Sequence, residues 1–329
     1  MSVLLQVKNL RTTFPSASGP MPVVDDISFD LARGEVLALV GESGSGKSMT
    51  ALSILRLVPK PGKVSSGSVL LAGEDLLRLP VTEMRRVRGA RIAMIFQEPM
   101  TSLNPVVAVG AQVMEAIQLH DPINKVDARS RARALFAEVG IPDPEARLDA
   151  YPHHLSGGLK QRVMIAMALS MRPEILIADE PTTALDVTVQ AQILTLLRNL
   201  QRERGTAILL ITHDLGIVNE LADRVAVMYA GRLVEVAERK ALLSNPLHPY
   251  TQGLLKSIPS RTPAGERLPE IPGVVPSPDQ WPTGCRFSTR CPLCFEPCET
   301  IQPEEIEDSA GRRVWCHEVE RSMDAESSS

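Results

Sequence analysis

The chain has 329 residues, 44% hydrophobic and 22% charged, and its 35 basic and 39 acidic side chains leave a net charge of −4. This composition is typical of an ordinary folded protein, and the negative balance argues against non-specific binding of nucleic acid, which depends on basic patches. No apolar run approaches the roughly 18 residues of a membrane-spanning helix, and Gln6, Lys8 and Arg11 interrupt the N-terminus too early for a signal peptide, so we expect a cytosolic chain.

The first strong pattern is a strand that runs into a glycine-rich turn. Alternating and apolar residues predict strands over residues 3–40, and the last of these, Val36–Val40, is almost entirely apolar. It leads directly into GESGSGKS (41–48) and then into TALSILRL, which has helical spacing. A strand, a glycine-rich turn and a helix form the context in which GxxxxGKS predicts a phosphate-binding loop.

The residues of this loop have separate predicted roles. Gly41, Gly44 and Gly46 allow the backbone to curl so that successive N–H groups point at a phosphate. Lys47 would bring a positive charge to the β- and γ-phosphates, and the hydroxyl of Ser48 would bind Mg²⁺. The positive N-terminal end of the following helix would add to the attraction.

The middle of the chain changes from helical to strand-like patterns. Residues 97–155 show mostly helical spacing, whereas Ile175–Ala178, Ala207–Ile211 and Val225–Met228 are short apolar runs typical of buried strands. Strands that alternate with helices predict an α/β core with a mainly parallel sheet. We therefore interpret the helical stretch as an inserted subdomain.

An acidic pair follows the apolar run ILIA at residues 175–178. Asp179, at the end of the predicted strand, would bind Mg²⁺, and Glu180 would accept a proton from the attacking water as general base. An acidic pair of this kind can also be a simple strand end beside a helix cap. Together with the phosphate loop, it predicts a nucleoside triphosphatase.

A second predicted anion site lies at LSGGLKQRV (155–163). Ser156 is a favourable N-cap, and Gly157 and Gly158 would expose backbone N–H groups at the positive end of a helix. An ordinary serine-capped helix is the alternative. Because the phosphate loop already holds one nucleotide, we expect this second site to contact the nucleotide bound by another copy.

Taken in chain order over residues 1–240, these motifs resemble the Walker A, signature and Walker B elements of ABC nucleotide-binding subunits. The resemblance implies an α/β P-loop NTPase fold with a mixed or parallel sheet, an antiparallel β N-terminal part, an inserted helical subdomain and a small Cys-rich C-terminal extension. By resemblance, Gln97 in IFQEP is the Q-loop residue, Asp186 in TTALD the D-loop aspartate and His213 in LLITHD the switch histidine. By the same resemblance, LSGGLKQRV (155–163) is the signature motif. Its one departure is Leu159, at a position where the motif often has glutamine, although Gln161 follows two positions later.

The resemblance assigns a full set of site residues for ATP and Mg²⁺. Catalysis is assigned to Lys47, Gln97, Glu180 and His213, and Mg²⁺ to Ser48, Gln97 and Asp179. The nucleotide would lie against Phe14, Gly41, Ser43, Gly44, Ser45, Gly46, Lys47, Ser48, Met49, Gln97 and Asp179. The second subunit would contribute Ser156, Gly157, Gly158, Gln161 and Asp186. The ring face of Phe14 is predicted to stack on adenine.

Three further stretches resemble the ATPases of oligopeptide, dipeptide and nickel importers, namely QEPMTSLNP (97–105), HPYTQGLLKSIP (248–259) and VPSPDQWPTGCRFSTRC (275–291). The resemblance implies uptake of peptides, or alternatively of nickel or another small solute. A soluble ABC ATPase of repair or translation would instead show two tandem cassettes or a long coiled-coil insertion. The intact Lys47, Glu180 and His213 argue against a purely regulatory subunit with an inactive site.

The implied partners are a second ATPase subunit that we expect to be a paralogue, two membrane permeases and an extracytoplasmic solute-binding protein, with no nucleic acid. The chain would lie on the cytoplasmic face of the inner membrane as a peripheral subunit. We expect an ATPase domain over residues 1–245, with a helical subdomain at about 97–170. Residues 246–329 would form a Pro-rich, largely non-helical linker and the Cys-rich extension.

All the cysteines follow residue 284, at Cys285, Cys291, Cys294, Cys298 and Cys316. In a cytosolic chain such a cluster suggests a metal rather than disulfides. Zinc and a [4Fe–4S] cluster both accept four thiolates. The resemblance to peptide importers favours a [4Fe–4S] cluster on Cys285, Cys291, Cys298 and Cys316, with Cys294 as the additional residue.

Overall fold

The computed structural model describes residues 2–97, 102–183, 185–257 and 269–327, which form two compact units. The first unit is built mainly from Arg78–Leu210, together with Ala32–Glu35. The second combines Val3–Leu31, Val36–Leu77 and Ile211–Ser329. Each unit is considered separately below.

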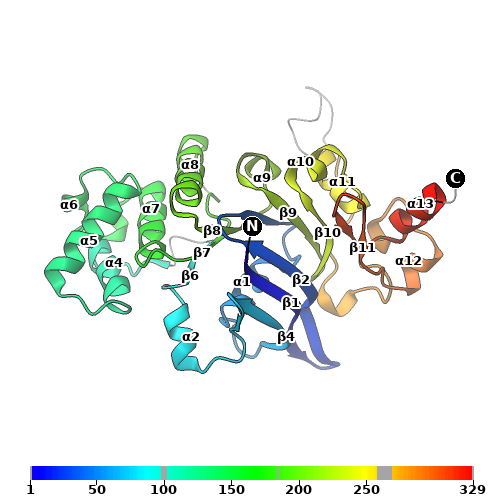
Figure 1. Cartoon of the computed structure of the whole chain (residues 1–329), viewed down its shortest axis with the longest axis horizontal. Coiled ribbons are helices and arrows are strands. Elements are labelled where there is room, and N and C mark those ends of the chain that lie inside the picture. The colour runs from blue at the N-terminus through cyan, green and yellow to red at the C-terminus, as the bar shows by residue number, and fades with distance from the viewer. Residues whose placement is uncertain (1, 98–101, 184, 258–268, 328–329) are drawn as a thin grey trace. The chain divides into compact units, whose positions relative to one another are not determined.

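The first unit contains strands and a layer of helices (Figure 1). Its elements are α2 (Val81–Val87), β6 (Ile92–Ile95), α4 (Val109–Gln118), α5 (Lys125–Glu138), α6 (Pro144–Arg147), η1 (Pro152–His154), α7 (Gly157–Ala168), β7 (Ile175–Asp179), α8 (Val187–Arg204) and β8 (Ala207–Thr212, which ends in the second unit). The strand order here is β8-β7-β6, and β6 runs parallel to β7.

The helices α4, α5 and α7 pack against one another through buried apolar faces (Figure 1). Val113 and Ile117 lie one turn apart on α4, and Ala132 and Phe136 lie one turn apart on α5, all fully buried. This four-residue spacing places each pair on one face of its helix. The predicted helical insertion is confirmed.

The second unit holds most of the strands and the whole C-terminal part. Its elements are β1 (Val3–Ser16), β2 (Gly19–Ala32), β3 (Val36–Val40), α1 (Lys47–Ile54), β4 (Lys63–Leu71), β5 (Glu74–Asp75), α9 (Leu215–Leu221), β9 (Arg224–Tyr229), β10 (Arg232–Glu238), α10 (Arg239–Ser244), α11 (Pro249–Lys256), η3 (Pro278–Gln280), η4 (Ser288–Arg290), α12 (Glu296–Thr300), β11 (Ile306–Glu307), β12 (Arg313–Val314) and α13 (His317–Ser327).

The second unit contains an antiparallel sheet near the N-terminus and part of a mixed sheet, which confirms the predicted fold class. One sheet has the order β2-β1-β4-β5, and β1 pairs antiparallel with β4, so that Leu5 faces Leu71. The other contains β11-β12-β10-β9-β3, in which β3 and β9 are parallel and β9 and β10 antiparallel. All five residues of β3 are buried, as its continuous apolar sequence predicts.

Three aromatic rings join the C-terminal part to the end of β9. The ring centroids of Tyr229 and Tyr250 lie 4.7 Å apart, and that of Phe287 lies 5.2 Å from the first and 5.3 Å from the second. Tyr250 belongs to α11, which lies within the segment predicted to be largely non-helical. Pro249 is tolerated there because it occupies the first turn of the helix, where its missing N–H has no helical partner.

The buried carboxylate of Asp25 forms ion pairs with three arginines near this aromatic cluster. Asp25 pairs with Arg11 at 2.6 Å, Arg232 at 3.0 Å and Arg286. Burial alone would raise the pKa of Asp25, but the nearby positive charges, led by Arg286, lower it below its usual value. Arg286 also lies over the ring of Trp281, with its guanidinium carbon 3.6 Å from the ring centroid.

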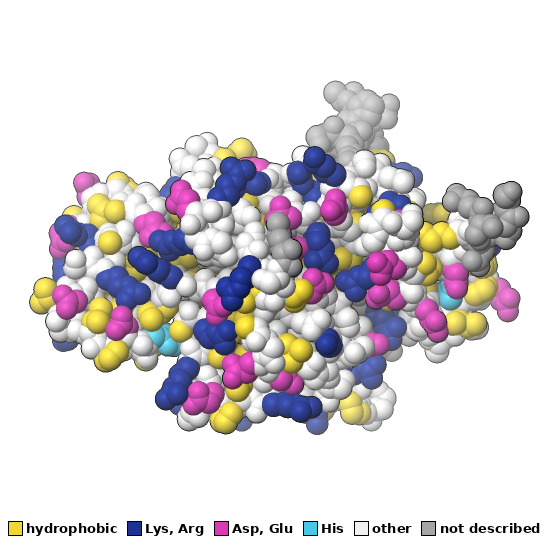
Figure 2. Space-filling model, in the orientation of Figure 1, with side chains coloured by type: hydrophobic (Ala, Val, Ile, Leu, Met, Phe, Trp, Pro, Cys, Tyr) yellow, Lys and Arg dark blue, Asp and Glu magenta, His cyan; other side chains and the backbone are white. Residues whose placement is uncertain are grey.

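The surface carries charges of both signs in close mixture. Figure 2 shows Lys and Arg side chains interspersed with Asp and Glu side chains, with scattered hydrophobic side chains among them. Val106, Leu119 and Val126 are among the most exposed hydrophobic residues of the first unit. Of the helices within the described residues, none has the length and apolar character required to cross a membrane.

We predict that Asp25→Asn lowers the free energy of unfolding by about 3–5 kcal/mol, because it leaves the buried guanidinium of Arg286 without its counter-charge. Asp30→Asn is the matched control. The carboxylate of Asp30 lies 3.4 Å from its partner Arg224, and the side chain of Asp30 is 36% exposed. Asp30→Asn should therefore lower the free energy of unfolding by at most about 1 kcal/mol. Denaturant unfolding of the full chain measures both, and equal effects would contradict the prediction.

Candidate functional site

The phosphate loop joins β3 to α1 in the second unit, as the sequence predicts. Lys47 begins α1, and its buried ammonium donates to the carbonyl oxygens of Gly41 at 2.8 Å and Glu42 at 2.9 Å. Ser43 and Gly44 are exposed, whereas Ser45 is fully buried. The tip of the loop is therefore accessible to a ligand while its base is held in the core.

Gly41 is the position where the loop approaches the core most closely. Its φ is +154°, and a Cβ at this residue would lie 2.1 Å from the carbonyl oxygen of Met228. Only glycine fits such an approach. Further along the loop, the carbonyl of Ser45 accepts a hydrogen bond from the N–H of Gly231 at 2.8 Å. The end of β9 and the β9–β10 turn thus contact the loop at both Gly41 and Ser45.

The remaining predicted residues of the second unit lie around this loop or at strand ends. Ser48 and Met49 are half-buried in the first turn of α1. Phe14, near the end of β1, is also half-buried, and its ring packs against Gly62. His213 is exposed directly after β8. The proposed stacking of Phe14 and the switch role of His213 stay predictions.

In the first unit, the end of β7 presents the acidic pair. Asp179 is buried, and Glu180 has a left-handed backbone with φ +46°, a conformation that costs a non-glycine residue roughly 1 kcal/mol. The carboxylate of Glu180 accepts hydrogen bonds from the amide of Gln97 and the hydroxyl of Thr183, each at 2.9 Å. The predicted base and the predicted Q-loop residue are therefore in direct contact.

The predicted signature motif opens α7 next to the start of α8. The Ser156 hydroxyl accepts from the N–H of Leu159 at 3.4 Å, and Asp186 caps α8 by accepting from the N–H of Val189 at 2.9 Å. A Cβ on Gly158 would lie 2.8 Å from a methyl carbon of Val189. The two helix starts are thus close together, as a composite anion site requires.

Gln161 makes a hydrogen bond within its own chain. Its side chain is buried, and its amide nitrogen donates to the carbonyl of Pro181 at 2.6 Å. It thereby ties α7 to the turn that follows Glu180. A direct contact between Gln161 and a nucleotide on another subunit stays a prediction.

These contacts define what the two sets of residues can do. The loop of the second unit offers backbone N–H groups and one ammonium to phosphates. The first unit offers two adjacent carboxylates, one held by an amide and a hydroxyl, beside two capped helix starts. An anion cradle, a pair of acidic side chains and a second anion site are the parts needed to bind and hydrolyse a nucleoside triphosphate.

Among the described residues, all five cysteines are present as free thiols. Cys298 and Cys316 are buried. Burial, reinforced by Cys316, Cys298 and Cys291, raises the pKa of the Cys285 thiol to about 12. No group of three His, Cys, Asp or Glu side chains within the described segments is arranged closely enough to hold a metal ion.

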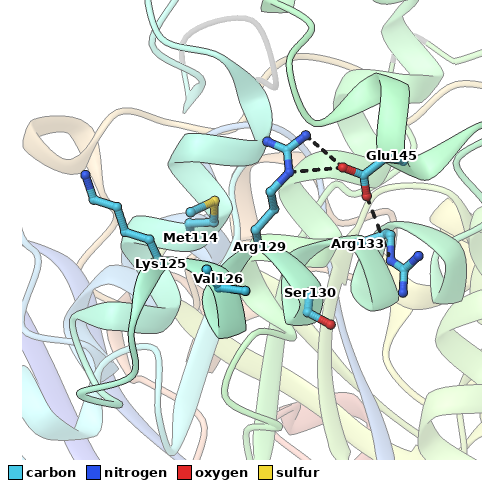
Figure 3. Close-up of a pocket in the computed structure, with 7 residues that line it drawn as sticks. All are labelled: Met114, Lys125, Val126, Arg129, Ser130, Arg133 and Glu145. Atoms are coloured by element: carbon cyan, nitrogen blue, oxygen red, sulfur yellow. Dashed lines mark hydrogen bonds and ion pairs between the residues drawn. The ribbon is translucent and has the colours of Figure 1, made fainter.

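A cavity of about 410 Å³ lies on the helical layer of the first unit (Figure 3). It is lined by Met114 of α4, five residues of α5 and Glu145 of α6, and none of these described residues belongs to the predicted nucleotide set. Glu145 accepts from Arg129 at 2.9 and 3.0 Å and lies 3.9 Å from Arg133 (Figure 3). Arg129 and Arg133 are thus paired with Glu145, and the predicted nucleotide residues lie elsewhere.

Thr183 is a site residue that the sequence reasoning missed. Its position three residues after Glu180 in EPTT is a signal that could have indicated a hydroxyl folding back on the carboxylate. The stretch QEPMTSLNP continues through residues 98–101, which lie outside the described residues. Only Gln97 and residues 102–105 of that stretch can be located.

Two family models match the chain. The one described as ABC transporter covers residues 24–183, and the one described as oligopeptide/dipeptide transporter, C-terminal region, covers residues 234–298. The oligopeptide transport ATP-binding protein AppD of Bacillus subtilis is 51% identical over 96% of this chain and 97% of its own. The dipeptide transport ATP-binding protein DppD of Haemophilus influenzae is 50% identical over 95% of each chain.

A solved structure resembles the nucleotide-binding part. It is a dimeric post-hydrolysis state of the ATP-binding cassette MJ0796 bound to ADP and Pi, with a TM-score of 0.65 and 26% identity. The match covers 72% of this chain and 99% of the cassette. The fold seen here is therefore that of known ATP-binding cassettes.

We predict that Gly41→Ala weakens ADP binding at least tenfold (about 1.4 kcal/mol), because the added methyl would displace the loop from Met228. Gly205→Ala is the control, since its φ is +64° and no described atom lies within 4 Å of the added Cβ. This control should lose about 1 kcal/mol of stability but keep its affinity. Calorimetric titration with ADP measures both, and normal binding by Gly41→Ala would contradict the prediction.

Proposed function

Because the chain belongs to the ATP-binding subunits of the oligopeptide/dipeptide family of ABC transporters, we propose that it hydrolyses ATP to drive peptide uptake through a membrane importer. The observation that carries this proposal is the phosphate loop between β3 and α1, combined with the supported carboxylate of Glu180 after β7. The relatives AppD and DppD are named for oligopeptide and dipeptide transport, which favours peptides over nickel and transport over repair or translation.

In the proposed reaction, the backbone of residues 41–46 and the ammonium of Lys47 bind the phosphates of ATP. Ser48, Gln97 and Asp179 would hold Mg²⁺, which neutralises phosphate charge when bound. Glu180 orients the attacking water and accepts its proton. The hydrogen bonds from Gln97 and Thr183 keep the Glu180 carboxylate in place before the substrate arrives, and His213 would act beside the γ-phosphate.

Two copies are required for a complete site in this proposal. Ser156, Gly157 and Gly158 of one subunit would contact the phosphates held by the loop of the other, with Gln161 and Asp186 nearby. The exposed Val187, 83% accessible at the start of α8, is an apolar side chain that such an interface would cover. ATP binding would then favour the closed dimer, and hydrolysis would reopen it.

We propose that a pair of paralogous ATPases works beneath two permeases with an extracytoplasmic solute-binding protein, at the cytoplasmic face of the inner membrane. Residues 1–245 would serve nucleotide binding, with the helical subdomain at about 97–170 transmitting movement to the permeases. Exposed Val106 and Leu119 of that subdomain are suited to an apolar contact. Residues 246–329 would form the extension specific to this family.

We predict that Glu180→Gln lowers steady-state ATP hydrolysis by about 100-fold or more, because an amide cannot accept the proton of water. The variant should also accumulate as an ATP-bound dimer in size-exclusion chromatography. Glu174→Gln is the control, because Glu174 lies at the other end of β7, where it pairs with Arg91 at 2.7 Å. Unchanged hydrolysis in Glu180→Gln would refute the role of Glu180 as base.

We further propose that Cys285, Cys291, Cys298 and Cys316 hold a [4Fe–4S] cluster, with zinc as the alternative. Support comes from the burial of Cys298 and Cys316 and from the pKa values of the Cys285 and Cys291 thiols, which burial raises and the nearby Cys316 and Cys298 raise further. Cys294, the additional residue, also lies near Cys291 and Cys298. The raised thiol pKa values mean that metal binding must displace these protons.

We predict that protein purified without oxygen contains about four iron and four sulfide ions per chain. Cys316→Ser should lose them, whereas the matched Cys294→Ser should retain them. Elemental analysis and visible absorption measure the outcome. Colourless protein that contains zinc but no iron would favour the alternative.

A further inference from the structure

Glu42 occupies a variable position of the phosphate loop, yet its polar groups are fully engaged. Its carboxylate receives a two-pronged contact from Arg290, with Nη1 to Oε2 at 2.8 Å and Nη2 to Oε1 at 3.0 Å. Its backbone N–H donates to the hydroxyl oxygen of Tyr250 at 2.9 Å. Its carbonyl accepts from Lys47 at 2.9 Å. Two of these three partners come from the C-terminal extension.

Arg290 is itself fixed from several sides. Its side chain is only 4% exposed, and Nε donates to the carbonyl of Pro272 at 2.8 Å. Its guanidinium carbon lies 5.7 Å from the ring centroid of Tyr229. Paired hydrogen bonds from a planar guanidinium determine both the position and the orientation of a carboxylate. We therefore expect Arg290 to determine the position of the Glu42 carboxylate, rather than the reverse.

The same segment reaches the other end of the loop. Arg286 donates to the carbonyl of Ala230, and the next residue, Gly231, donates its N–H to Ser45 at 2.8 Å. Trp281 packs on Gly231, where a Cβ would lie 2.7 Å from the indole ring. The segment CRFSTRC (285–291) thus supports the loop at Glu42 directly and at Ser45 through the β9–β10 turn.

The charge of Glu42 gives Arg290 a second effect. A carboxylate within a loop that binds phosphates repels its ligand unless a cation neutralises it. Arg290 supplies this cation from the buried side. Its removal would loosen the loop and also expose the ligand to an uncompensated negative charge.

We propose that Arg290 and Tyr250 are positioning residues for nucleotide binding, which act through Glu42 to hold and neutralise the phosphate loop. This inference rests on the proposed ATPase function, because its ligand is the nucleotide of that site. A loop held in its binding shape avoids the cost of ordering when the ligand arrives. The extension, which lies outside the motifs of the ATPase core, then becomes part of the binding apparatus.

The test is calorimetric titration of the full-length chain with ADP, a ligand that is not consumed. Arg290→Gln should raise Kd about tenfold, and Arg290→Lys, which keeps the charge, should raise it less. Tyr250→Phe removes one oxygen and should raise Kd severalfold. Arg312→Gln is the matched control, since it breaks the 2.6 Å pair with Asp308 elsewhere in the extension, and its Kd should stay within twofold of wild type.

The decisive variant is Arg290→Gln combined with Glu42→Gln. If Arg290 acts through Glu42, removing the carboxylate should restore most of the affinity lost in Arg290→Gln, a coupling that general damage to the fold would not produce. The hydrolysis assay should show KM rising more than kcat falls in Arg290→Gln.

Three results would overturn the inference. The first is wild-type affinity for ADP in both Arg290→Gln and Tyr250→Phe. The second is an increase of Kd in the control Arg312→Gln as large as that in Arg290→Gln. The third is a double variant in which the increases of Kd multiply, as they would for two independent substitutions. If Arg290→Gln does not fold, wild-type affinity in Tyr250→Phe overturns it alone. Failure of the wild-type chain to bind ADP would overturn the proposed function as well, so the two failures are distinguishable.

Discussion

The packing of Tyr229, Tyr250 and Phe287 is the contact on which the second unit depends. Each ring removes a large apolar surface from water, and each tilted or edge-to-face pair adds about 0.5–1.5 kcal/mol beyond that burial. Tyr229 ends β9 and immediately precedes the turn that supports Ser45. Phe287 directly follows Arg286 and lies three residues before Arg290. Once this ring is buried, the chain on either side can deliver one arginine to each end of the phosphate loop.

Features that depend on neighbouring residues could be predicted from the sequence. The strand before Gly41, the helix after Gly46 and the cap at Ser156 are all determined by side chains within a few residues. The continuous apolar run of β7 likewise predicts a strand buried on both faces, with Asp179 at its end. Because each of these elements depends on residues that are close together in the chain, the elements and their order could be predicted from the sequence.

Contacts between distant parts of the chain were not accessible in this way. Glu42 and Arg290 are separated by 248 positions, and neither periodicity nor spacing indicates that they meet. Glu42 occupies a variable position of GxxxxGKS, so the motif assigns it no role. The helix α11 was missed for a related reason, since the density of prolines suggested a linker although Pro249 lies where a helix tolerates it.

The two types of contact made by CRFSTRC complement each other physically. Aromatic burial is strong but only weakly directional, so Phe287 alone would allow the segment to shift against β9. Buried arginine–carboxylate pairs gain little net stability because desolvation offsets their attraction. Their bidentate geometry nevertheless defines a single orientation. Burial lowers the pKa of Arg286 to about 10, so it keeps its charge at neutral pH. The rings therefore supply the affinity of the extension for the core, and the arginines supply its register on the phosphate loop.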